Sequence, residues 1–85
     1  MKIEFDPAKD ETNLLEHGLS FNDFEGFDDE PLELIDNRAD YGEVRFRSFG
    51  RIDGVGYMIV YTIRNGAMRL ISFRRAHEKE MRRYE

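Results

Sequence analysis

The sequence predicts an α+β fold in which a small antiparallel sheet packs against helices. Two dipeptides of the second half, Asp53-Gly54 and Asn65-Gly66, separate runs of alternating apolar residues, which is the pattern of β-hairpins. Helix-forming runs with capping signals lie in the first third of the chain and at its end. At 85 residues the chain is expected to be one domain, residues 1–85, with a compact core.

The chain is predicted to begin with a short strand and a helix. Residues 2–5 alternate polar and apolar side chains, as in a strand. Asp6 then offers an N-cap, and Pro7 stands at the favoured first position of a helix that we expect to reach His17. The expected buried stripe and left-handed stop of this helix are Leu14, Leu15 and Gly18.

A second N-terminal helix is predicted to follow at once. Ser20 is placed to cap it, and Asp23 stands three residues later, as in a capping box. Phe24 and Phe27 would anchor it to the core, and it is expected to end near Asp28.

The remainder is predicted to be a sheet followed by one helix. Residues 32–36 form a short strand, and residues 44–52, 56–64 and 67–74 form a three-stranded antiparallel meander. Residues 76–84 contain strong helix formers, and the side chains expected on the apolar side of that helix are Met81 and Tyr84. The expected order is β-α-α-β-β-β-β-α.

Charge is divided unequally between the two halves of the chain. Residues 1–42 contain three Lys or Arg and thirteen Asp or Glu. Residues 43–85 contain ten Lys or Arg and five Asp or Glu. The net charge of −5 therefore conceals a dipolar molecule, and the segment from Ile71 to Tyr84 is the expected place for a polyanion.

Strand alternation predicts one apolar face and one basic face of the sheet. Side chains on one strand alternate between faces, so Ile71 and Phe73 should lie together, opposite Leu70, Ser72 and Arg74. If helices cover the apolar face, the open face collects Arg45, Arg47, Arg64 and Arg74. Arginine holds phosphate through two parallel hydrogen bonds, which suits a nucleic acid backbone. The alternative interpretation is that these arginines only neutralise the acidic half of the chain.

Several classes of protein are disfavoured by composition. The chain has no cysteine, which excludes disulfides and thiolate metal sites and is compatible with a reducing cytoplasm. No apolar run approaches the roughly 20 residues that cross a bilayer, and the acidic start does not resemble a signal peptide, so we expect a cytoplasmic protein with no membrane partner. His17 and His77 are far apart, and no cofactor or metal is expected.

Two motifs near the ends of the chain resemble the BrnT family of bacterial toxins. The first is Phe5-Asp6-Pro7-Ala8-Lys9 followed by the run from Asn13 to Phe21, and the second is Ile71-Ser72-Phe73-Arg74-Arg75-Ala76 with Tyr84. Marks between them also fit the family, among them Glu43-Val44-Arg45-Phe46, Gly50 and Val60-Tyr61-Thr62. The resemblance covers essentially the whole chain.

The resemblance implies a RelE-like fold and a metal-independent endoribonuclease that inhibits translation and growth. It also implies a BrnA-like ribbon-helix-helix antitoxin that neutralises the toxin. DNA would then be contacted only through the antitoxin, and a complex of two toxins and two antitoxins is compatible with this organisation.

Metal-free RNA cleavage needs proton transfer at the 2′-hydroxyl and at the leaving oxygen, and cations that stabilise the pentavalent phosphorane. His17 is a candidate acid or base, because imidazole titrates near pH 6.5; its alternative role is to cap a helix end. Glu43 or Glu78 could orient a partner. The candidate catalytic residues are His17, Arg45, Arg74, Arg75 and Tyr84, and the candidate RNA-binding residues are Arg47, Arg64 and Arg69.

The chain departs from the family pattern at Glu16. Family members usually carry lysine before the His-Gly pair, so a cation near the expected site is replaced by an anion. The alternative prediction is therefore a catalytically weak or inactive member that binds its antitoxin and serves in operon autoregulation.

Overall fold

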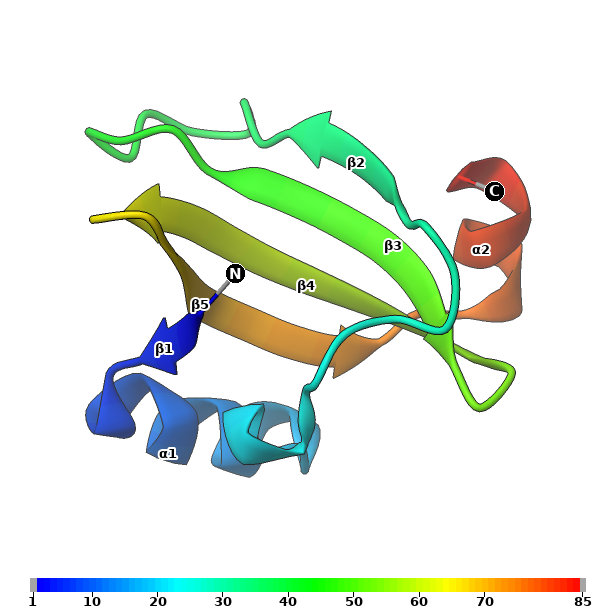
Figure 1. Cartoon of the computed structure of the whole chain (residues 1–85). Coiled ribbons are helices and arrows are strands. Elements are labelled where there is room, and N and C mark those ends of the chain that lie inside the picture. Colours follow the sequence, from blue (N-terminus) through cyan, green and yellow to red (C-terminus); the bar gives the residue numbers. More distant parts are fainter. Residues whose placement is uncertain (1, 85) are drawn as a thin grey trace.

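The computed structural model describes residues 2–84 and has an α+β architecture built on a five-stranded sheet (Figure 1). Met1 and Glu85, the ends of the expected domain, lie outside the described residues. The elements in chain order are β1 (Ile3–Phe5), α1 (Pro7–His17), the 3-10 turn η1 (Phe21–Asp23), β2 (Leu32–Ile35), β3 (Phe46–Ile52), β4 (Val55–Arg64), β5 (Ala67–Arg75) and α2 (Glu78–Tyr84).

The strands are ordered β1-β5-β4-β3-β2, and the sheet is mixed. Three pairings are antiparallel, but β1 lies parallel to β5, with Glu4 opposite Arg69. The prediction of an antiparallel sheet was therefore wrong for β1. The direction of this strand depends on its docking against the distant β5, for which the local sequence carries no signal.

Both predicted hairpin turns are confirmed. Asp53 and Gly54 have φ of 51° and 80°, and Asn65 and Gly66 have φ of 52° and 76°. Two successive residues with positive φ produce the turn whose twist matches that of the flanking strands. The meander β3-β4-β5 therefore forms where the sequence predicts it.

The second predicted helix is wrong, because only the 3-10 turn η1 forms. Ser20 caps it as expected, and its hydroxyl accepts from the backbone N–H of Asn22 at 3.1 Å. The chain then becomes extended at Phe24, and Gly26 takes a φ of 118°. This extended path lets Phe27 reach β3, where a Cβ on Gly50 would overlap its ring.

Helix α1 begins and ends as predicted, but its buried stripe is different. Asp6 caps its start and Gly18 its end, with a φ of 71°. Leu14 and Leu15, predicted to be buried, are 50% and 83% exposed, whereas Asn13 is only 4% exposed. The prediction fails because α1 meets the sheet at the edge of β5 and contacts it through a polar side chain.

Asn13 completes the free edge of β5. Its side-chain amide donates to the carbonyl oxygen of Phe73 at 2.8 Å, and its oxygen accepts from the N–H of Phe73 at 2.9 Å. The amide also donates to the carbonyl of Leu19 at 2.9 Å. Asn13 therefore occupies the position that a neighbouring strand would take beyond the end of β1.

A bulge in β5 divides the apolar side chains between two cores. Val60 pairs with Ser72 and the next residue, Tyr61, with Leu70, so Ile71 is the extra residue. Leu70 and Phe73 therefore share one core, and Ile71 packs on the other face. The predicted alternation, with Ile71 beside Phe73 and opposite Leu70, was wrong because it assumed a regular strand.

The larger core lies under η1 and the loop that follows it, with Phe21, Phe24, Ile59, Tyr61, Leu70 and Phe73 buried. The smaller core lies on the opposite face under α2, with Phe49, Met58, Val60, Ala76 and Met81 buried. The expectation of one fully open face is therefore wrong at the α2 end of the sheet. Gly56 permits this contact, because a Cβ there would overlap the side chain of Met81.

We predict that Asn13→Ala destabilises the protein by about 2–4 kcal/mol, because it leaves the buried N–H and C=O of Phe73 without partners. Urea unfolding at neutral pH measures the loss. The matched control is Asn22→Ala at an exposed position, which should change the free energy of unfolding by less than about 0.5 kcal/mol. Equal stability of the two variants would contradict the role given to Asn13.

Candidate functional site

Five arginines define what we call the basic face of the sheet. Register places Arg47, Arg64, Arg69 and Arg74 on the side that carries the smaller core. Arg45, which directly precedes β3, joins them because it shares Glu43 with Arg64. On β4 and β5, Arg69 pairs with Thr62, and Arg74 pairs with Met58. The five residues are Arg45, Arg47, Arg64, Arg69 and Arg74.

Arg45 and Arg64 meet at one carboxylate. Nε of Arg45 donates to Glu43 at 3.0 Å, and the guanidinium of Arg64 lies 3.6 Å from the other oxygen of Glu43. The guanidinium of Arg45 also lies 4.2 Å from the centre of the Tyr41 ring. Glu43 thus orients two cations.

Arg74 holds α2 against the sheet. Its two terminal nitrogens donate to the two oxygens of Glu80 at 3.0 and 2.9 Å. The hydrogen bond from Arg74 lowers the pKa of the Glu80 carboxyl from 4.5 to about 2. A second paired contact joins Arg51 and Glu78, at 3.0 and 3.3 Å. Arg74, a candidate catalytic residue, therefore also has a structural role.

Arg47 differs from the other four arginines of the basic face. Its register neighbours are Leu34 on β2 and Val60 on β4, both apolar. Its Nε is buried and makes no hydrogen bond, and within residues 2–84 its guanidinium forms no ion pair, whereas Arg69 lies 3.9 Å from Glu4. Arg47 is thus a cation whose charge the described part of the chain leaves uncompensated.

Arg75 lies on the other face. It pairs with Tyr57, which packs against the larger core, so Arg74 and Arg75 project to opposite sides of β5. The side chain of Arg75 is exposed. The structure therefore does not bring Arg75 together with the basic face.

Tyr84 packs as an end anchor of α2. Its ring stacks on Phe49 with centroids 4.3 Å apart and an interplanar angle of 22°. The same ring lines a hollow of about 400 Å³, together with Leu32, Gly50 and Arg51. Tyr84 is therefore held by the sheet and still borders open space.

His17 is the last residue of α1, and its Nε2 lies 3.8 Å from Glu16. The hydrogen bonds and ion pairs of residues 2–84 do not connect it to the arginines of the basic face. Glu16 itself lines a hollow of about 420 Å³ with Thr12, Ile71 and Ser72. Glu16 thus places a carboxylate beside β5, next to the basic face.

The chain matches the family model for a ribonuclease toxin, BrnT, of type II toxin-antitoxin systems, over residues 5–80. The protein belongs to the BrnT family. The comparison with curated proteins gives no significant match. BrnT membership identifies the chain as a ribonuclease toxin of a two-component system in which an antitoxin is the partner.

Two further observations concern this BrnT chain. Among residues 2–84, no three His, Cys, Asp or Glu side chains are grouped so that they could hold a metal ion. Over the same residues, no helix is both long enough and apolar enough to cross a membrane.

The sequence could not reveal which carboxylates hold Arg74 and Arg69. Glu80 reaches Arg74 across the joint between β5 and α2, and Glu4 reaches Arg69 from the parallel strand β1. Neither spacing follows a helical or strand period. Only the tertiary arrangement therefore shows that four of the five basic-face arginines are already paired.

We predict that Glu80→Gln lowers the free energy of unfolding by about 1 kcal/mol at pH 6, a value typical of partly exposed pairs. The folded-state pKa of Glu80 lies below its ordinary value, so the stabilisation is present above about pH 5 and is lost as the pH falls towards 2. Urea unfolding at pH 6 and near pH 2 measures the loss of stability, with Glu11→Gln on α1 as the control. A loss that is the same at pH 6 and near pH 2 would contradict the ion pair as its source.

Proposed function

We propose that the protein is a metal-independent endoribonuclease whose RNA substrate lies across the basic face, and that RNA cleavage inhibits translation and growth. The observation that carries the proposal is Arg47, which lies between apolar neighbours with a buried Nε that lacks a partner. No carboxylate among residues 2–84 compensates the charge of Arg47, so the guanidinium is available to hold a phosphate. The BrnT family assigns RNA as the polyanion.

The paired arginines are arranged to support this contact. Glu43 holds Arg45 and Arg64 in place before substrate binds, so less rotamer freedom is lost when a phosphate arrives. A phosphate between Arg45 and Arg47 would meet cations from consecutive positions on the same side of the strand. These cations would stabilise the charge of the phosphorane during cleavage.

In this proposal His17 transfers protons and Tyr84 contacts a base, both at the border of the basic face. His17 ends α1 next to Glu16, whose hollow reaches Ser72 of β5. Tyr84 borders a separate hollow beside β3 and α2, where its ring can stack on a base. Arg75 has no part in this arrangement, because it projects from the other face.

The proposal includes neutralisation by a cognate antitoxin. BrnT toxins belong to type II systems, in which the partner is a protein. We propose a BrnA-like ribbon-helix-helix antitoxin that connects the toxin to DNA, in a complex of two toxins and two antitoxins.

A second candidate function is a catalytically weak module that binds antitoxin. Two observations favour it: carboxylates already neutralise four arginines of the basic face, and Glu16 adds an anion to the adjacent hollow. In that case the protein would bind its antitoxin and serve in operon autoregulation without cutting RNA at a useful rate.

We predict that Arg47→Ala weakens RNA binding by about tenfold and reduces the slope of log K against log salt by about one, because one phosphate contact is lost. Fluorescence anisotropy with a labelled single-stranded RNA over a salt series measures both quantities, and gel analysis of the same RNA measures cleavage. Arg75→Ala is the matched control, since it removes an exposed arginine from the opposite face. Equal effects of the two substitutions would contradict the proposed RNA site.

We predict that Glu16→Lys strengthens RNA binding and raises the cleavage rate severalfold, because a cation replaces an anion beside the basic face. Cleavage by purified protein and growth of cells expressing each version are the measurements. Glu11→Lys makes the same charge change at another exposed position of α1 and should have a smaller effect. If neither the original chain nor the Glu16→Lys variant cleaves RNA, the antitoxin-binding module is favoured.

A further inference from the structure

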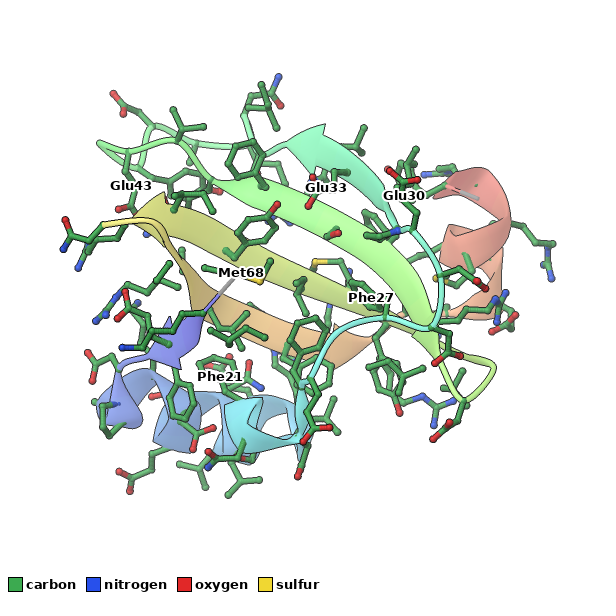
Figure 2. The ribbon with its side chains drawn as sticks, viewed as in Figure 1. Phe21, Phe27, Glu30, Glu33, Glu43 and Met68 are labelled. Carbon is green, nitrogen blue, oxygen red and sulfur yellow. The ribbon has the colours of Figure 1, made fainter. Side chains whose placement is uncertain are left out.

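The face opposite the arginines carries an apolar groove rimmed by acids. A cavity of about 610 Å³ opens between the loop after η1 and the sheet, with Phe24, Phe27 and Met68 among its apolar walls and Glu25, Glu30 and Glu33 among its acidic ones. Figure 2 views this face and shows Phe27, Glu30, Glu33 and Met68 arranged around it. The groove thus combines an apolar floor with negative charge.

Exposed apolar side chains extend the groove along the sheet. Ile35 pairs with Phe46, which pairs with Tyr61, so these three side chains form one row across three strands. Ile35 is 65% exposed, and Ile63, which pairs with Met68, is 45% exposed. A connected apolar surface of this kind on a small protein marks an interaction site.

The acids of the groove are available to a cationic partner. Glu25 and Glu30 are exposed, and within residues 2–84 none of the three glutamates forms an ion pair. Glu33 accepts a hydrogen bond from the Tyr61 hydroxyl and one from Ser48 at 3.4 Å. Burial and the contact with Glu33 raise the pKa of the Tyr61 phenol, so it remains the donor. Glu33 is therefore an oriented carboxylate with acceptor capacity to spare.

We propose that the antitoxin docks in this groove through a segment that places an apolar side chain against Phe27 and Met68 and sets Lys or Arg beside Glu25, Glu30 and Glu33. This proposal rests on the proposed function for the existence of a neutralising antitoxin. RNA is disfavoured here because its phosphates would face three carboxylates. A second copy of the chain, paired through the same face, would oppose like charges to like charges.

The geometry separates the two binding surfaces. The groove and the basic face lie on opposite sides of one sheet, so substitutions in the groove leave the arginines in place. Antitoxin binding and RNA binding should therefore be separable by mutation. This separation distinguishes a failure of the docking proposal from a failure of the ribonuclease proposal.

The test measures binding of the purified protein encoded by the adjacent gene, by isothermal titration calorimetry. Glu25→Lys and, separately, Ile35→Glu should each weaken binding at least tenfold, because the first reverses a charge of the groove and the second removes an apolar contact. The matched controls are Glu11→Lys and Leu15→Glu on the exposed side of α1, which should bind within twofold of the original chain. Circular dichroism checks that every variant is folded, and RNA binding should be retained in all of them.

Four outcomes would overturn the proposal. The groove variants could bind as tightly as the original chain, Leu15→Glu could be the variant that loses binding, or the adjacent protein could fail to bind at all. Light scattering that shows a dimer of the chain dissociated by the groove variants would assign the groove to self-association and also overturn it. If the original chain does not cleave RNA and only the groove variants lose binding of the adjacent protein, the ribonuclease proposal is rejected and the docking site is supported.

Discussion

The pairing of the Asn13 amide with the peptide groups of Phe73 is the contact on which the arrangement of this protein depends. β5 is bordered by β4 on one side and by β1 on the other, but β1 is only three residues long and ends opposite Leu70. Asn13 then satisfies the edge at Phe73 and fixes α1 along it. Because this contact is polar and narrow, α1 is attached without burying its leucines, and its outer side is left free.

The bulge at Ile71 has an equally wide consequence. The bulge changes the alternation of side chains between Leu70 and Ser72, so β5 contributes apolar side chains to both cores. The loop after η1 covers one face of the sheet, and α2 covers part of the other. The same shift places Arg69 and Arg74 on one side despite their odd separation in sequence. Bulges that redirect side chains in this way are frequent beside functional sites.

Arginines on one face of the sheet and acids around the groove on the other match the two kinds of partner that we propose. A Debye length of about 8 Å at physiological salt limits how far the acids of one face weaken the field of the other. The arginines can therefore attract a polyanion although the chain as a whole has a net charge of −5. The proposed RNA site and the proposed antitoxin groove therefore lie on opposite sides of one sheet.

The sequence by itself determined the local features: the Asp6 cap, the Gly18 stop, both two-residue hairpin turns and the positions of the long strands. It also carried the BrnT identity, since short motifs with fixed spacing survive as a pattern of letters. Tertiary structure alone decided the parallel direction of β1, the loss of the second helix, the bulge at Ile71 and the ion-pair partners of the arginines. The direction of β1 and the bulge depend on pairing with other strands, and local propensity does not specify which groups the fold brings together.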